Sequence, residues 1–136
     1  AVRVVLDTNV LVSALWSPGR AAWQVTEAVR DGRLVPLHDE RILAEYGDVL
    51  TRPAFGFAVE DVAELIDLFE RFGEAVSADP LELLVPDPDD LAFLEVAVTG
   101  RADAIVSGNR RHFPDTRGVE LLSPRELLER LEGAPH

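Results

Sequence analysis

The sequence of 136 residues contains no cysteine, no methionine and no lysine. The absence of cysteine excludes disulfides, thiolate metal sites and cysteine nucleophiles, and it is typical of a cytoplasmic protein. The absence of lysine excludes Walker-type phosphate loops and every mechanism that depends on a lysine amine. No apolar run approaches the roughly 18 residues of a membrane span, and the first residues do not have the pattern of a signal peptide. We therefore expect a cytoplasmic protein with no membrane partner.

The thirteen basic residues are all arginine, and they are outnumbered by 25 acidic residues, which gives a net charge of −12. Such a charge opposes non-specific adhesion to nucleic acid, so a nucleic-acid partner would need a local basic patch or bound cations. The chain is 47% hydrophobic and has the usual length of one domain. We expect a single domain over residues 1–136 with a substantial core.

Strands and helices are predicted to alternate along the whole chain. The run 2–6 is aliphatic and rich in β-branched residues, which is typical of a strand buried on both faces of a parallel sheet. The pattern indicates one α/β domain with a mainly parallel sheet and helices on both sides. Further strands are expected at 33–39, 81–85, 103–109 and 119–122, and helices at 9–16, 21–30, 40–51, 59–73, 86–100 and 123–133, with Asp39, Asp87 and Ser123 as N-caps.

Two acids fall at places where an ordinary surface charge is not expected. Asp7 directly follows the first strand, at the edge where open parallel sheets place their sites, although it could simply cap the next helix. Glu45 lies beside Ile42 and Val49 at the border of an apolar helix stripe and is expected to be half-buried. An acid on the flank of a helix explains Glu45 equally well.

A third acid, Asp90, lies at the start of a predicted helix. It aligns with Leu94 and Ala97 on the buried face, whereas Asp89 is explained by the favourable effect of acids in a first helical turn. Asp103 precedes its strand and is expected at the opposite edge of the sheet. The polar residues that follow this strand at the edge of interest are Ser107 and Asn109.

Three carboxylates from distant segments are therefore expected to converge. Clustered carboxylates repel one another and resist burial unless a cation neutralises them. Oxygen ligands suit Mg²⁺ or Mn²⁺, and with no cysteine and only three histidines a zinc site has little support. Such a metal site suits hydrolysis of a phosphodiester, because the metal activates water and stabilises charge on the phosphate.

Four segments together resemble the PIN domain family, in order and with fitting spacing over nearly the whole chain: VVLDTNVLVSAL, LAEYGDVL, DPDDLAFLEVAV and ADAIVSGNRRHFP. The sequence is most similar to bacterial VapC-like toxin components of toxin–antitoxin pairs. The resemblance implies that Asp7, Glu45 and Asp90 are the catalytic, metal-binding acids of the family.

The family often has a fourth acid where this chain has Asn109. The resemblance makes Asn109 a further metal-site residue, able to hold a metal-bound water or to orient a phosphate, but its lack of charge puts a second metal in doubt. Thr8, Asn9 and Ser107 match the polar positions that support the metal ligands in the family.

The resemblance also implies a three-layer α/β/α sandwich with a parallel sheet of about five strands. The implied activity is that of a Mg²⁺- or Mn²⁺-dependent ribonuclease, held in check by a small antitoxin protein and acting as a homodimer.

Competing interpretations come from other proteins that have an acid after the first strand. A haloacid-dehalogenase-type phosphatase would need a second Asp where this chain has Asn9, and a receiver domain of a two-component system would need a lysine. The remaining alternative is a PIN-fold RNA- or protein-binding module with weakened catalysis. Asn109 and the acidic net charge favour this alternative, whereas the three intact acids argue against it.

A dense basic run, NRRHF, directly follows the fourth expected strand. Arg110 and Arg111 could hold RNA phosphates beside the metal, and His112 could stack on a base or contact phosphate. In so acidic a chain these arginines could equally well pair with surface acids.

Overall fold

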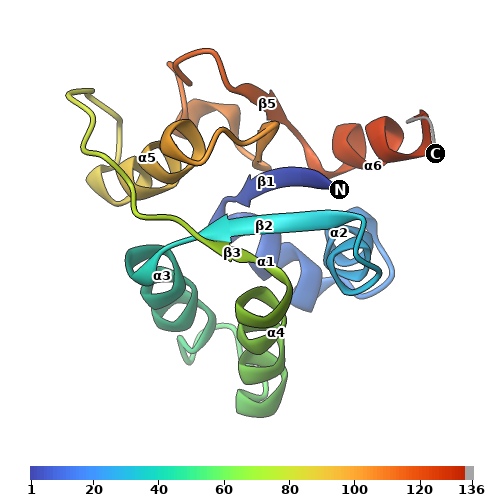
Figure 1. The fold of residues 1–136 in the computed structure, drawn as a ribbon. Helices are drawn as coiled ribbons and strands as arrows, with labels where there is room; N and C mark the ends of the chain where they lie inside the picture. Colours follow the sequence, from blue (N-terminus) through green and yellow to red (C-terminus); the bar gives the residue numbers. More distant parts are fainter. Residues whose placement is uncertain (134–136) are drawn as a thin grey trace.

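Five parallel strands form the centre of the molecule, in the order β3-β2-β1-β4-β5 (Figure 1). A computed structural model describes residues 1–133, so the predicted domain boundary at residue 136 lies outside the described residues. The strands are β1 (Val2–Leu6), β2 (Leu34–His38), β3 (Glu74–Ala75), β4 (Ala104–Val106) and β5 (Glu120–Leu122).

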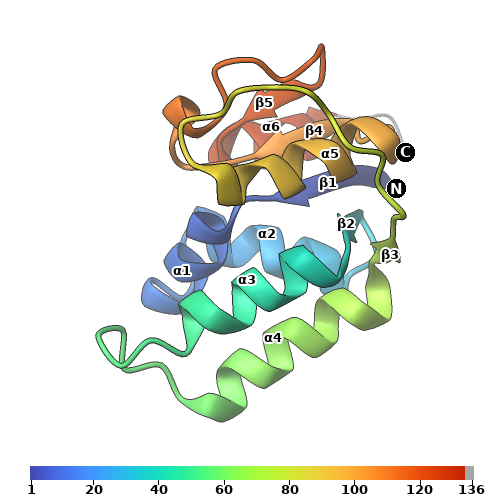
Figure 2. The same cartoon turned by 90° about the vertical axis from the view of Figure 1, so that its left-hand side faces the viewer.

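Helices cover both faces of this sheet. In Figures 1 and 2, α1 to α4 lie on one face and α5 on the other, while α6 follows β5 and packs against α2. This arrangement confirms the predicted α/β/α sandwich with a parallel sheet of about five strands. The helices are α1 (Thr8–Trp16), α2 (Ala21–Arg30), α3 (Glu40–Leu50), α4 (Val59–Phe72), α5 (Leu91–Thr99) and α6 (Pro124–Gly133), and 3₁₀ turns span Pro88–Asp90 and Arg110–His112.

The three predicted N-caps are confirmed. The side chains of Asp39, Asp87 and Ser123 each accept a hydrogen bond from a backbone N–H of the following turn, at 3.0 to 3.1 Å. Glu126 accepts a return bond from the Ser123 N–H at 2.9 Å, which completes a capping box. Side-chain chemistry within one turn therefore sets where these helices begin, which is why the sequence alone located them.

The strand predicted over 81–85 is wrong. The strand that follows α4 is instead β3, which lies earlier in the chain. Gly73 allows this early pairing, since a Cβ at that position would lie 2.4 Å from the carbonyl oxygen of Pro36 in β2. Residues 76–87 then cross the outside of α5 as irregular chain (Figure 2). The Leu81 N–H is satisfied by the carboxylate of Glu95 at 2.7 Å, and Leu84 is 94% exposed.

The core is centred on β1 and on the helices packed against it. Val4, Val5 and Leu6 are fully buried, as expected for a central strand covered on both faces. Within residues 1–133, no helix combines the length and the apolar character that crossing a membrane requires.

Candidate metal centre

The site lies at the carboxyl edge of the two central strands, where the sequence predicted it. Leu6 of β1 is paired in register with Val106 of β4, so the next residues, Asp7 and Ser107, leave the sheet side by side. The Asp7 N–H donates to the Val106 carbonyl at 2.9 Å. The pairing register thus brings together two residues that are separated by a hundred positions.

Asp7 is buried and surrounded by polar partners. Its Oδ2 accepts hydrogen bonds from Ser107 Oγ at 2.7 Å and from Asn9 Nδ2 at 3.2 Å, and Nδ1 of His112 lies 2.7 Å from the same oxygen. Asn9 also accepts from the Gly108 N–H at 3.0 Å, so it connects the start of α1 to the turn after β4. These contacts place Asn9 and Ser107 against the carboxylate of Asp7, and their role in supporting a metal ligand stays a prediction.

Thr8 is the third of the polar residues expected to support the metal ligands, and its surroundings differ from those of Asn9 and Ser107. Its Oγ1 is buried and has no hydrogen-bond partner in the described chain. A buried hydroxyl without a partner is costly, and it adds an unsatisfied polar atom directly beside Asp7.

Asp90 reaches the site from the 3₁₀ turn before α5. Its side chain is only 7% exposed, and within residues 1–133 its carboxylate accepts no hydrogen bond. Burial, reinforced by the negative charge of Asp7, raises the pKa of Asp90 from 3.8 to about 6. A buried carboxylate without donors is the kind of group that a cation would stabilise.

His112 completes the cluster. One ligand atom from each of Asp7, Asp90 and His112 can be chosen so that all three lie within 4.8 Å of one another. Burial by itself would lower the pKa of His112, but the hydrogen bond to Asp7 and the charges of the two acids outweigh it and raise that pKa. The sequence assigned His112 to RNA contact and missed this position, although the residue lies in the turn that follows β4.

Glu45 lies close to this cluster but does not join it. It is half-buried on α3, as predicted, and lines a cavity of about 250 Å³ with Asp89 and Phe93. Burial, followed by the charge of Asp89, raises the pKa of Glu45, and the charge of Glu45 in turn helps to raise the pKa of Asp90. The structure therefore brings together two of the three predicted acids and adds a histidine, while the metal-binding role of Glu45 stays a prediction.

Asn109, the other predicted metal-site residue, is exposed. Its Oδ1 accepts the Arg111 N–H at 3.0 Å and caps the 3₁₀ turn. Asp103 lies at the opposite edge of the sheet, as predicted, where it accepts from the Arg3 N–H at 2.8 Å.

The two arginines of the basic run differ in their surroundings. Arg110 forms an ion pair with Glu126 and donates to the Leu121 carbonyl at 3.1 Å, which matches the alternative that these arginines pair with surface acids. Arg111 is exposed and has no ion pair within residues 1–133. Any RNA contact by this turn therefore depends mainly on Arg111.

A family model of the PIN domain matches residues 3–111. The chain belongs to the PIN domain family. Among solved structures, this PIN domain is similar to PAE2754 from Pyrobaculum aerophilum, with a TM-score of 0.62, 20% identity and coverage of 98% of this chain and 91% of that one. It is also similar to a chain of VapBC2 from Rickettsia felis, solved with a promoter DNA fragment, with a TM-score of 0.58, 18% identity and coverage of 89% and 98%.

At these identities, the similarity to the solved structures establishes the fold alone. A comparison with curated proteins gave no match.

A buried tyrosine, which sequence reasoning missed, anchors α3 of this PIN domain to the strand end beside the candidate metal centre. The hydroxyl of Tyr46 donates to the Leu6 carbonyl at 2.5 Å, one residue before Asp7. Its ring meets Phe69 edge-on at 5.6 Å, and burial, together with the charge of Asp7, raises the pKa of the Tyr46 phenol well above its usual value. The sequence did offer a signal for this contact, because Tyr46 directly follows Glu45 and is an aromatic residue in the apolar stripe of the helix.

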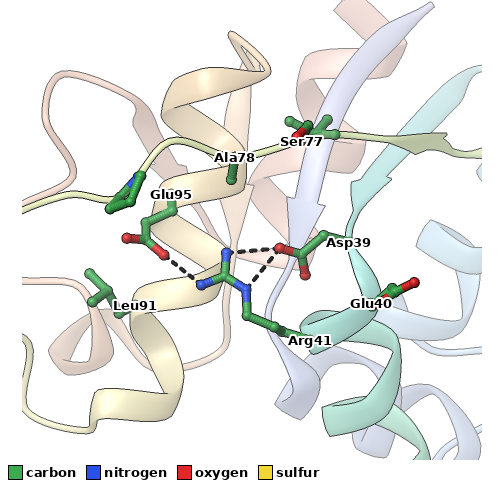
Figure 3. A pocket seen from close by; sticks show the side chains of 9 residues that line it. Asp39, Glu40, Arg41, Ser77, Ala78, Leu91 and Glu95 are labelled. Carbon is green, nitrogen blue, oxygen red and sulfur yellow. Dashed lines mark hydrogen bonds and ion pairs between the residues drawn. The ribbon is translucent and has the colours of Figure 1, made fainter.

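A second anchor joins α3 to α5 across a cavity of about 530 Å³ (Figure 3). Arg41 donates to Asp39 at 2.8 Å and to Glu95 at 2.6 Å. The other oxygen of Glu95 accepts from the Leu81 N–H, so this buried acid also holds the segment 76–87. The Arg41 bridge fixes the helix of Glu45 relative to the helix that Asp90 precedes.

Proposed function

We propose that this PIN domain is a Mg²⁺- or Mn²⁺-dependent endoribonuclease that hydrolyses phosphodiester bonds of RNA. The observation that carries the proposal is the cluster of Asp7, Asp90 and His112, in which Asp90 is only 7% exposed and its carboxylate accepts no hydrogen bond within residues 1–133. The donor set fits a divalent cation, because carboxylate oxygens are its preferred ligands and a cation would offset the burial of both acids.

In this proposal Asp7 and Asp90 hold the cation, and Glu45 completes the catalytic acids from the adjoining cavity. A bound divalent cation would supply an activated water and neutralise charge on the attacked phosphate. Ser107 and Asn9 keep Asp7 in its orientation through their hydrogen bonds. Asn109 would act at the border of the site, through water or on the phosphate.

The proposed RNA contact is the turn Arg110–His112 beside the metal centre. Arg111 supports it best, because its guanidinium is exposed and is not neutralised by an acid of the described chain. A local positive charge is what a protein of net charge −12 needs in order to approach a phosphate.

In the cell, we propose that the protein acts in the cytoplasm as the toxin of a toxin–antitoxin pair. The similarity of its fold to a chain of VapBC2 supports this role, as does membership of the PIN domain family. The partners in this proposal are an RNA substrate, a small antitoxin protein and a second copy of the chain.

The test is incubation of purified protein with a panel of RNAs in Mn²⁺, in Mg²⁺ and in EDTA. Cleavage should appear with metal, vanish in EDTA and fall by at least about 100-fold in Asp90→Asn, since even residues that only support metal ligands cost 10- to 100-fold. Asp79→Asn is the matched control, because Asp79 is an exposed acid outside the cluster. Cleavage that persists in EDTA, or that survives Asp90→Asn, would contradict the proposal.

The second candidate is a PIN-fold RNA- or protein-binding module with weakened catalysis. The observation that favours it is Asn109, an uncharged residue whose side-chain oxygen is engaged by its own turn. This candidate predicts RNA or protein binding with no cleavage in any metal, so the same incubation, read together with a binding assay, separates the two.

A further inference from the structure

The turn after β4 presents a nitrogen donor to a site otherwise built from oxygen. Building on the proposed metal-dependent function, we propose that His112 is a direct metal ligand and that it makes the centre selective for a first-row transition-metal ion such as Mn²⁺ over Mg²⁺. Three features of the structure support this assignment.

The first feature is the crowding of one oxygen of Asp7. A carboxylate oxygen offers about two lone-pair directions, and Ser107 and Asn9 already donate to Oδ2. His112 Nδ1 makes a third contact with that oxygen, at 2.7 Å. Two donors besides the imidazole thus reach that oxygen, and a metal ion that replaces the imidazole proton would be held by Nδ1 of His112 together with the carboxylate of Asp7.

The second feature is the state of Asp90. This side chain is more than nine-tenths buried, accepts no hydrogen bond within residues 1–133, and has a ligand atom within 4.8 Å of ligand atoms of both Asp7 and His112. Two carboxylates and one imidazole therefore surround one small space. Asp90 occupies the N-cap position of α5, but its side chain makes no capping hydrogen bond, so helix capping does not explain this buried carboxylate.

The third feature is the construction of the turn itself. Asn109 directs its side-chain oxygen onto the Arg111 N–H, and Arg110 is held by Glu126 and by the Leu121 carbonyl. Both contacts fix the 3₁₀ turn that carries His112. The uncharged Asn109 is thus used to build the turn, and the donor that the turn delivers to the centre is imidazole.

The choice of metal follows from the donor type. Mg²⁺ prefers oxygen ligands and loses water reluctantly, whereas imidazole binds first-row transition metals well. All of these metals also exceed Mg²⁺ in affinity for mixed nitrogen and oxygen sites, with Mn²⁺ the weakest of them. Replacement of a carboxylate by a histidine should therefore weaken Mg²⁺ binding more than Mn²⁺ binding.

The decisive experiment uses Mn²⁺ as the probe and reads binding rather than activity. Mn²⁺ affinity is measured by electron paramagnetic resonance and Mg²⁺ affinity by competition. Electron spin-echo modulation then tests for a histidine nitrogen bound to Mn²⁺, with ¹⁵N-histidine protein to identify the signal. The variants are His112→Ala and His112→Asp, and the control is Arg111→Ala, which alters the same turn without removing the nitrogen donor.

Wild-type protein should show strong coupling of Mn²⁺ to a histidine nitrogen, and His112→Ala should abolish it. His112→Ala should lower Mn²⁺ affinity by on the order of 10- to 100-fold and Mg²⁺ affinity much less. His112→Asp should restore binding while reducing the preference for Mn²⁺, and Arg111→Ala should leave the preference unchanged.

Two other results have separate meanings. If Mn²⁺ binds without nitrogen coupling, and His112→Ala weakens both metals equally, His112 only supports Asp7 through a hydrogen bond; the inference is then overturned while the proposed nuclease function stands. If neither metal binds wild-type protein, the proposed function and the inference built on it both fail.

Discussion

Asp7 and Asp90 are two buried carboxylates of one site with opposite surroundings. Asp7, at the end of β1, is 2% exposed, accepts hydrogen bonds from Ser107 and Asn9, and contacts His112. Asp90, before α5, is 7% exposed and accepts no hydrogen bond within residues 1–133. The sheet side of the centre is therefore satisfied by the protein's own donors, whereas on the helix side the Asp90 carboxylate accepts no hydrogen bond within residues 1–133 and only the nearby charge of His112 opposes the repulsion from Asp7.

This difference shows how one centre can be both rigid and ready to bind. The sheet side is held by strand register and by hydrogen bonds that do not depend on a cation. On the helix side, burial and the charge of Asp7 raise the pKa of Asp90 to about 6. Near neutral pH the carboxylate therefore ionises at a cost in folding free energy. A bound cation would relieve that cost, which couples metal binding to stability.

The largest expected effect comes from removing the carboxylate charge of Asp90. Without metal, Asp90→Asn should raise the free energy of unfolding at neutral pH by up to about 3 kcal/mol, because the folded-state pKa of Asp90 lies above its ordinary 3.8. The penalty is absent below the unfolded pKa, grows as pH rises through about 6 and is constant above it. Urea unfolding in EDTA at about pH 4 and about pH 8 measures it.

Asp79→Asn is the control for this prediction, since it removes an exposed acid outside the cluster. If wild-type and Asp90→Asn proteins have the same pH dependence of unfolding, ionisation of Asp90 does not cost folding free energy. A loss of stability in Asp90→Asn would show instead that the carboxylate is satisfied in the folded state.

On the sheet side, removal of a polar group should lower the free energy of unfolding rather than raise it. Ser107→Ala removes a buried hydroxyl that donates to Asp7 at 2.7 Å, so the free energy of unfolding should fall by about 1 to 3 kcal/mol. Ser13→Ala is the matched control, because Ser13 is exposed on α1 and its hydroxyl makes no hydrogen bond within residues 1–133. Equal effects of the two changes in chemical denaturation would remove the contrast between the two sides.

A smaller effect is expected from the bridge that positions the helix side. Glu95→Gln weakens the contact to Arg41 and should lower the free energy of unfolding by about 1 kcal/mol, since Arg41 is half-exposed and its charge is screened. Mn²⁺ affinity should fall as well, because α5 is no longer fixed against α3. Glu129→Gln, at an exposed acid of α6 with no ion pair within residues 1–133, should change neither quantity. A stability loss with unchanged Mn²⁺ affinity would limit the bridge to a structural role.

The smallest effect is expected at Arg111, in the turn after β4 on the sheet side of the centre. Arg111→Ala should reduce the salt dependence of RNA binding by a slope of about 0.7, the value for one phosphate contact with a single strand. Arg71→Ala, an exposed arginine on α4, is the control. Filter binding at several salt concentrations measures both slopes. An unchanged slope in Arg111→Ala would place the RNA on another surface.

Local patterns predicted most of the fold correctly. The boundaries of β1 and α2 agree with the predicted ranges, and α3, α6 and the 3₁₀ turn that leads into α5 begin where a side-chain cap was expected. The error at 81–85 arose because a segment with four aliphatic residues out of five looked like a better strand than Glu74–Ala75. Gly73 instead lets the chain pass close to β2 and pair there, and a close approach of this kind is not visible in apolar patterning.

The candidate site divides in the same way. The sequence by itself determined that Asp7 follows a buried strand and that Asp90 lies on a buried helix face, because strand and helix periodicity depend on residues near in the chain. The resemblance of four segments to PIN domains pointed to the same two acids. Only the tertiary structure decided that Ser107 and His112 meet Asp7, that Tyr46 and Arg41 fix α3, and that Glu45 stands apart from the cluster. These contacts join residues 40 to 105 positions apart or depend on the angle between helices, and such relations are set by strand register and packing rather than by any local pattern.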